Sequence, residues 1–191
     1  MSPRKLWLVL PAIVALLLVV IFCGNLITKN KLVDFNKTNV NEKISMKIES
    51  NVFADNKMIP VQYTCYGDKT QIPIKILDVP NNAKSLALIV DDPDAPGGNF
   101  VHWVVWNINP NTLIIENNRN IKNAVEGYTS LGKPGWIPPC PPSGTHHYNF
   151  KLYALDTVLS IPKSSTKEDL LRAMNGNIID RATLVGLYGR E

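Results

Sequence analysis

The longest hydrophobic stretch of the chain lies close to its first residue. Positions Leu6–Ile27 are apolar with two exceptions, and the basic residues Arg4 and Lys5 precede them. A run of this length is sufficient for a helix to cross the hydrocarbon core of a bilayer. The pattern therefore predicts one N-terminal transmembrane helix within residues 1–27, which serves either as a membrane anchor or as a signal segment.

A polar segment separates this run from the rest of the chain. Residues 28–45 are rich in Asn and Lys and show no sustained period, which predicts a stalk that carries a domain over residues 46–191. We expect an anchored protein whose domain lies outside the cytoplasm. A secreted form, or a lipoprotein modified at Cys23, is the alternative. No clear A-x-A cleavage pattern follows the apolar run, and Phe22 stands where lipoprotein processing prefers a small residue.

Two segments in the middle of the chain have the pattern of buried strands. The stretch "SLALIVD" from Ser85 is continuously apolar, as in a strand covered on both faces. Phe100–Ile108 also has the length and composition of a strand. Strict alternation would place on one face Phe100, His102, Val104, Trp106 and Ile108, and on the other Val101, Trp103, Val105 and Asn107.

The remaining pattern predicts further strands and one helix. Strands are expected at Met46–Ser50, Val61–Cys65 and His147–Leu155, and in the last apolar piece from Ala182. Near the end of the chain, Ser165 and Glu168 have the spacing of a capping box, an apolar face follows, and Gly176 can end the helix. The domain is therefore expected to be mostly β with a single C-terminal helix.

Composition narrows the classes of function. With 191 residues and 45% hydrophobic positions, the chain can form one ordinary domain with a real core. Its formal charge of +4 comes from 20 basic and 16 acidic residues, which form no long run of one sign and no basic stripe beside aromatic residues. Nucleic acid is not an expected partner.

The two cysteines that follow Cys23 allow two interpretations. Cys65 and Cys140 form a disulfide candidate in an oxidising compartment, or they are two buried free thiols. Neither has a second cysteine or a histidine at short range, so their spacing does not fit a zinc site. Cys140 lies in an irregular stretch from Asn109 to Gly144 that contains six prolines. A loop of this length in a compact domain is usually functional or disordered.

The three histidines lie next to loops rich in Pro and Gly. His102 follows the turn "DPDAP", and His146 and His147 follow "PPSGT". This placement suggests that two loops from distant parts of the chain meet at one site. Prolines would hold the turn rigid and keep Asp92 and Asp94 in place, so that a carboxylate can orient a neighbouring imidazole. Such a pocket suits a small zwitterion or anion.

Each of these residues also has a structural interpretation. Asp92 and Asp94 can cap their own turn, because Asp beside Pro is common in turns. His102 can be a core histidine with satisfied hydrogen bonds, and His147 can face solvent. Taken singly, none of these residues supports a functional site.

Four motifs together resemble one family. The combination of "DPDAP", "HW", "PPSGTHHY" and "LYALD", in this order, resembles the phosphatidylethanolamine-binding proteins, within the bacterial and archaeal branch described as Raf kinase inhibitor-like. The similarity runs from about Met46 to Arg190 and includes "IPVQYTC" and "LVGLYGR". It implies a β-sandwich-like body with a large antiparallel sheet and a C-terminal helix.

The resemblance also implies a pocket for anions such as phosphate or phosphorylethanolamine head groups. By position, the expected ligand-binding residues are Asp92, His102, Pro142, Gly144, His146 and Tyr148, and the supporting residues are Asp94, Pro96 and His147. One departure concerns His147, which stands where the family usually has Arg. A titratable ring there replaces a permanently charged forked donor, and it would tether the acidic loop less firmly at neutral pH.

The leading hypothesis is a non-enzymatic binding protein for a small anionic or phospholipid head-group ligand, with no cofactor and no metal. Kinase or protease inhibition, reported for family members, is the regulatory role that the resemblance implies, and the protein target is open. A metal-dependent enzyme using the His/Asp cluster is the first alternative. The second is an interaction protein at the membrane surface whose pocket is vestigial.

Overall fold

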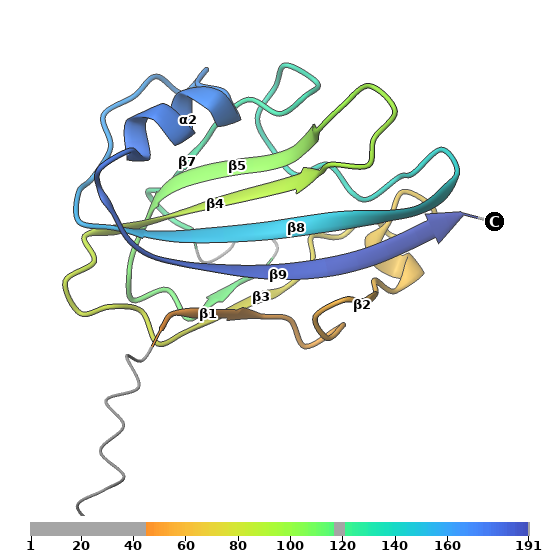
Figure 1. Cartoon of the computed structure of the whole chain (residues 1–191), viewed down its shortest axis with the longest axis horizontal. Helices are drawn as coiled ribbons and strands as arrows, with labels where there is room; N and C mark the ends of the chain where they lie inside the picture. The colour runs from red at the N-terminus through yellow and green to blue at the C-terminus, as the bar shows by residue number, and fades with distance from the viewer. Residues whose placement is uncertain (1–44, 117–120, 191) are drawn as a thin grey trace, which may run out of the picture. The chain divides into compact units, whose positions relative to one another are not determined.

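Strand β4 (Ser85–Asp92) is central to the larger of two sheets, and all of its residues are buried. The structure, a computed structural model, describes residues 45–116 and 121–190 (Figure 1). β4 pairs antiparallel with β5 (Phe100–Ile108) on one side and with β8 (Gly144–Leu155) on the other. The continuous apolar run predicted a strand covered on both faces, and this prediction is confirmed.

Three further strands complete the six-stranded sheet, in the order β2-β9-β8-β4-β5-β7. They are β2 (Lys57–Met58), β7 (Val125–Glu126) and β9 (Ile178–Arg190). Only the short β2, which pairs with β9, runs parallel to its neighbour. The strands predicted from His147 and from Ala182 are confirmed in β8 and β9, which are both longer than the pattern suggested.

A three-stranded sheet packs against one face of the large sheet. Its antiparallel strands are β1 (Lys47–Glu49), β3 (Ile74–Leu77) and β6 (Ile114–Ile115), in the order β1-β3-β6. Buried side chains of both sheets form one cluster, in which Ile48 and Ile76 of the small sheet join Leu88 and Phe150 of the large one. This is the sandwich-like body that the resemblance implied, and Figure 1 shows β1 and β3 below the large sheet.

Helix α2 (Lys167–Met174) covers the opposite face of the large sheet (Figure 1). Leu170 and Met174 are fully buried in a second cluster with Ile89 of β4 and Trp106 of β5. Within the described residues α2 is the only α-helix, which agrees with the predicted C-terminal helix. The large sheet is therefore covered on both faces.

The predicted capping box of this helix is wrong by one residue. Thr166 is the N-cap, its hydroxyl accepts a hydrogen bond from the Asp169 N–H, and the Asp169 carboxylate accepts from the Thr166 N–H. Ser165 is instead buried, and its carbonyl accepts a hydrogen bond from the backbone of Tyr128. The motif usually has Glu or Gln three residues after the N-cap. The pattern therefore favoured Ser165 with Glu168 over Thr166 with Asp169, the pair that forms the capping box.

Two β-bulges interrupt the alternation of β5. The register with β4 shifts at His102 and again near Asn107, whose φ of 57° lies in the left-handed region. Each extra residue exchanges the faces, so Trp106 packs on the helix side while Ile108 packs between the sheets. The predicted single face for His102, Trp106 and Ile108 is wrong. His102 contacts the ring of Tyr148, and Tyr148 lies in the same buried cluster as Trp103. His102 and Trp103, which were predicted on opposite faces, therefore both face the sandwich interior.

The predicted strand at Val61–Cys65 is also wrong. Val61–Tyr63 form a 3₁₀ helix (η1), with the Tyr63 N–H bonded to the carbonyl of Pro60. The Thr64 hydroxyl donates to the carbonyl of Val61 and holds this turn. Five residues of β propensity are too few to outweigh a proline and local hydrogen bonds.

The predicted anchor at Leu6–Ile27 and the stalk of residues 28–45 lie outside the described residues, apart from residue 45. In the part of the chain that is described, we find no helix of the length and apolarity that a membrane span requires.

Candidate functional site

A small cavity lies where the loop after β4, the start of β5, the proline-rich loop and the start of β8 meet. Its volume is about 230 Å³. It is lined by Asp92, Ala95, Pro96, Gly97, Phe100, His102, Ile137, Pro138, Cys140, Pro142 and His146. The turn "DPDAP" and the segment "PPSGTHHY" thus contribute to one site, as their histidines suggested.

Asp92 and His146 form a buried pair in this cavity. Nδ1 of His146 donates to Oδ2 of Asp92 at 2.7 Å, and the two side chains are only 8% and 5% exposed. The other oxygen, Oδ1, accepts the Asp94 N–H at 2.9 Å and so closes the turn after β4. Asp92 thereby performs both roles considered for it, turn cap and orienter of an imidazole.

His102 enters the cavity at its bulge. Its Nδ1 lies 2.9 Å from the carbonyl oxygen of Ile137, and its ring packs edge-on against Tyr148 and beside Phe100. A carbonyl oxygen only accepts, so Nδ1 carries the hydrogen and donates. Burial lowers the pKa of His102, against the opposing effects of the Ile137 carbonyl and of Asp92. The ring is therefore neutral at neutral pH.

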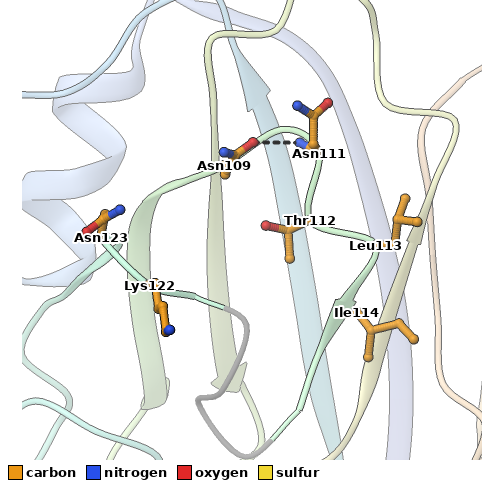
Figure 2. A pocket seen from close by; sticks show the side chains of 7 residues that line it. All are labelled: Asn109, Asn111, Thr112, Leu113, Ile114, Lys122 and Asn123. Atoms are coloured by element: carbon orange, nitrogen blue, oxygen red, sulfur yellow. Dashed lines mark hydrogen bonds between the residues drawn. The ribbon is translucent and has the colours of Figure 1, made fainter.

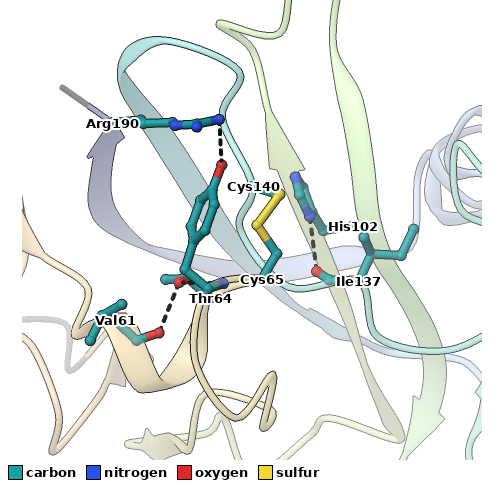
Figure 3. The surroundings of a disulfide bond; sticks show 8 residues. Val61, Thr64, Cys65, His102, Ile137, Cys140 and Arg190 are labelled. Carbon is teal, nitrogen blue, oxygen red and sulfur yellow. Dashed lines mark hydrogen bonds between the residues drawn. A yellow bond between two sulfur atoms is a disulfide. The ribbon is translucent and has the colours of Figure 1, made fainter.

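A disulfide supports the wall of the cavity next to His102. Cys65 and Cys140 are bonded, and the Cys65 N–H donates to the carbonyl of Pro139 at 3.0 Å. Figure 3 shows this bond beside the contact between His102 and Ile137. Of the two interpretations of the cysteines, the disulfide is therefore the correct one. It links the segment that follows η1 to the wall of the cavity.

The neighbouring pair of His147 and Asp94 lies outside the cavity. The backbone N–H and the ring Nδ1 of His147 both lie 2.7 Å from Oδ2 of Asp94. Their side chains are 52% and 39% exposed. The hydrogen bonds from His147 lower the pKa of Asp94. His147 therefore binds the acidic loop through Asp94, with one of its two bonds from the backbone.

Not all of the other predicted site residues line the cavity. Pro96 and Pro142 line the cavity, whereas Gly144 and Tyr148 do not. Gly144 has a φ of 68°, so its backbone explains why glycine stands there. Tyr148 is buried behind His102, and burial together with the charge of Asp92 raises its pKa. Tyr148 supports the ring of His102 and is not exposed to the cavity.

Several lining residues were not predicted. The lining includes Phe100, Ile137 and Pro138, with Ala95 and Gly97 from the acidic loop. Their side chains carry no chemistry that marks them in a sequence, and the position of Ile137 depends on the disulfide and on its bond to His102. For Ile137 and Pro138, the proline content of their loop was the only signal in the sequence.

Asp91, beside the site, holds three elements together. Its fully buried carboxylate accepts hydrogen bonds from Lys151 of β8 at 2.8 Å, from Lys167 at the start of α2 at 2.6 Å, and from Asn99. Burial acts to raise the pKa of Asp91, but the hydrogen bonds from Lys151 and Lys167 outweigh it, so the pKa is lowered. Asp91 therefore anchors the end of β4, on which the position of Asp92 depends.

A larger hollow of about 670 Å³ opens elsewhere on the domain (Figure 2). It is lined by Asn109, Asn111, Thr112, Leu113, Ile114, Lys122 and Asn123. The Asn109 side chain accepts the Asn111 N–H, and Leu113 is 67% exposed. An open hollow around a turn, in which Lys122 is the only charged lining residue described, has less to orient a ligand than the cavity at Asp92.

The described residues contain no group of three or more His, Cys, Asp or Glu placed to hold a metal ion. At the cavity, Asp92 and His146 are bonded directly to each other, and Nδ1 of His102 is directed at a carbonyl.

Comparison with known sequences decides the family. A sequence model described as phosphatidylethanolamine-binding protein matches residues 49–189. The chain belongs to the phosphatidylethanolamine-binding protein family. It is 46% identical over 150 residues to the UPF0098 protein of Methanothermobacter thermautotrophicus, a match that covers 76% of this chain and 99% of that protein.

Solved structures of the phosphatidylethanolamine-binding protein family agree with the fold. A homologue from Chlamydia trachomatis is 42% identical and superimposes with a TM-score of 0.74, over 78% of this chain and 99% of that one. Escherichia coli YbcL, described as a member of the mammalian family, is 28% identical with a TM-score of 0.70, over 77% of this chain and 99% of that one.

Proposed function

We propose that the cavity at Asp92, His102 and His146 binds a small anion-bearing head group, and that the protein acts as a binding protein rather than an enzyme. The observation that carries this proposal is the buried pair of Asp92 and His146 at the end of a cavity with an apolar wall. Convergent polar groups in an otherwise apolar pocket are typical of ligand sites.

The size of the cavity supports a small ligand. At about 230 Å³ it lies below the range of roughly 300–1,000 Å³ that is usual for drug-sized ligands. A phosphate or phosphorylethanolamine group is of suitable size, while the acyl chains of a phospholipid would have to stay outside. The prolines of the wall and the disulfide reduce the conformational freedom lost on binding.

The polar groups of the cavity support binding over catalysis. Asp92 accepts from both the Asp94 N–H and His146, and each imidazole has its Nδ1 engaged by a protein acceptor. Cys140 is held in the disulfide. The lining of the cavity contains no serine, no threonine and no free thiol, which supports binding over covalent catalysis.

We expect phosphate and phosphorylethanolamine to raise the melting temperature of the full-length protein and to give measurable heats in isothermal titration calorimetry. Asp92→Asn and His146→Gln should weaken binding by about tenfold or more, because each removes a partner of the buried pair. The matched controls Asp94→Asn and His147→Gln alter the exposed pair and should change affinity by less than about threefold. Equal losses in both sets, or no binding by the wild type, would reject the proposal.

A further inference from the structure

The disulfide between Cys65 and Cys140 lies at the surface of the domain. Cys140 is exposed and also lines the cavity, while Cys65 is half-buried. Whether a thiol reduces a protein disulfide depends on access to the sulfur atoms, and exposed disulfides are the labile ones. This bond is therefore open to exchange with thiols from solution, although it supports a wall of the cavity.

The wall on the Cys140 side has few backbone donors of its own. Residues 138–142, "PPCPP", form this wall, and we term them the proline segment. Four of the five are prolines, which have no N–H, so Cys140 is the one residue of the segment whose backbone can donate. Three residues of the segment line the cavity, namely Pro138, Cys140 and Pro142.

Cys65 makes two links to the proline segment. Its N–H donates to the carbonyl of Pro139 at 3.0 Å, and its sulfur is bonded to Cys140. Just before the segment, the Ile137 N–H donates to the carbonyl of His102 at 3.0 Å (Figure 3 shows this pair of residues beside the disulfide). The disulfide is the covalent one of these attachments.

The two sides of the disulfide are held differently. Next to Cys65, the fully buried Thr64 donates its hydroxyl to the carbonyl of Val61, and the same hydroxyl accepts the Tyr66 N–H. These local bonds do not involve sulfur, so they keep Cys65 in place when the disulfide is broken. Reduction would thus loosen the proline segment, and with it the cavity wall, more than the turn at η1.

We propose that this disulfide is a thiol-exchange site that controls the cavity, and that its substrate is a dithiol. A thiolate of the dithiol attacks the sulfur of Cys140, the S–S bond breaks, and Cys65 leaves as a thiolate that takes up a proton. The second thiolate of the reagent attacks the mixed disulfide, releases Cys140, and leaves as an oxidised disulfide. Two electrons and two protons pass to the protein. Only the effect on affinity rests on the proposed binding function.

Access to the bond is tested by its rate of reduction in the folded protein. The full-length chain with Cys23→Ser retains only the two bonded cysteines, and dithiothreitol followed by alkylation measures how fast they are released. The rate constant should not change with urea below the unfolding transition, because an exposed bond reacts without unfolding. A rate that rises in parallel with the unfolded fraction would overturn the proposal.

A matched pair of variants tests the role of Cys140. In the same background, Cys65→Ser leaves the Cys140 thiol free, and Cys140→Ser leaves the Cys65 thiol free. The Cys140 thiol should react with an aromatic disulfide reagent about tenfold faster, since it is the more exposed. Circular dichroism establishes that both variants are folded. If either is not, trapping of the wild-type bond with a monothiol decides, and an adduct chiefly on Cys65 would contradict the assignment.

The effect on the wall is measured by amide hydrogen exchange. After reduction, the Ile137 amide should exchange about tenfold faster, which corresponds to the freedom of about one backbone residue. The Tyr128 amide, bonded to the carbonyl of Ser165 in the same irregular stretch, should be unchanged. In calorimetry, phosphate should bind the reduced protein about tenfold more weakly, because its wall is less preorganised. The double variant Cys65→Ser/Cys140→Ser should match the reduced protein and ignore dithiothreitol.

The outcomes separate this proposal from the binding function. Unchanged exchange at Ile137 after reduction overturns control of the cavity, and so does unfolding of the reduced protein. Equal phosphate affinity in both states also overturns it and leaves the binding function intact. If the oxidised protein does not bind phosphate, the binding function fails, and the exchange rate of Ile137 alone decides whether the disulfide controls the wall.

Discussion

Adjacent histidines in β8 make nearly identical bonds to two aspartates of one turn, in opposite environments. His146 with Asp92 and His147 with Asp94 both have Nδ1–Oδ2 distances of 2.7 Å. The first pair is almost completely buried, and the second is about half exposed. Neighbouring residues of a strand point to opposite sides, so one step along the chain separates the cavity from solvent. The two bonds are equal in length, so burial is what distinguishes the two pairs.

The largest effect is expected from removing the buried carboxylate. Asp92→Ala leaves the Nδ1–H of His146 without its acceptor and should lower the free energy of unfolding by about 3 to 5 kcal/mol. Asp94→Ala, its exposed counterpart, should cost less than about 1 kcal/mol. Urea unfolding followed by circular dichroism measures both. Equal costs would mean that burial does not distinguish the two pairs.

An intermediate effect is expected in acid. The pKa of Asp91 is lowered in the folded protein, so its contribution to stability is present above the unfolded value near 3.8 and is lost as pH falls through the lower folded value. Asp94 shifts in the same direction but is exposed. Between about pH 4 and pH 2, stability should therefore fall less steeply in Asp91→Asn than in the wild type, and Asp94→Asn should follow the wild type closely. Urea midpoints at several pH values measure these slopes, and a larger change for Asp94→Asn would contradict the assignment.

The smallest effect is expected from placing an arginine in the exposed pair. His147→Arg keeps the backbone bond to Asp94 and replaces the ring with a permanently charged fork. Stability at neutral pH should change by no more than about 0.5 kcal/mol, as for most exposed substitutions. Thermal unfolding measures it. A loss of more than about 2 kcal/mol would show that the His147 ring has a structural role that its exposure does not suggest.

The sequence predicted the architecture better than the contacts at the site. Strand β4 was predictable because its apolar run is continuous, and β8 because its apolar residues alternate. The prediction of β9 came from residues of high β propensity, Thr183, Val185 and Tyr188. The faces of β5 were not, because a bulge at His102 and another near Asn107 depend on pairing with β4.

For the cavity, the sequence predicted which acidic and histidine side chains lie together, but not the bonds between them. The motifs placed Asp92, His102 and His146 together, but pattern alone does not choose which histidine meets which aspartate across 54 residues. The partner of His102 is the backbone carbonyl of Ile137, a group that every residue has. Its position comes from the folding of a loop rich in proline, for which no periodicity exists.

The bond between Cys65 and Cys140 closes a covalent ring whose two ends are 75 positions apart in the sequence. That ring includes β3, β4 and β5 and the acidic turn, whereas β8, α2 and β9 follow it. A single peptide cleavage inside the ring, for example beside the exposed Leu113, would leave two pieces still linked through sulfur. The nicked chain would migrate as one species on a gel without reductant and separate into two once a thiol is added. Gel mobility therefore reports whether the disulfide that supports the cavity wall is intact.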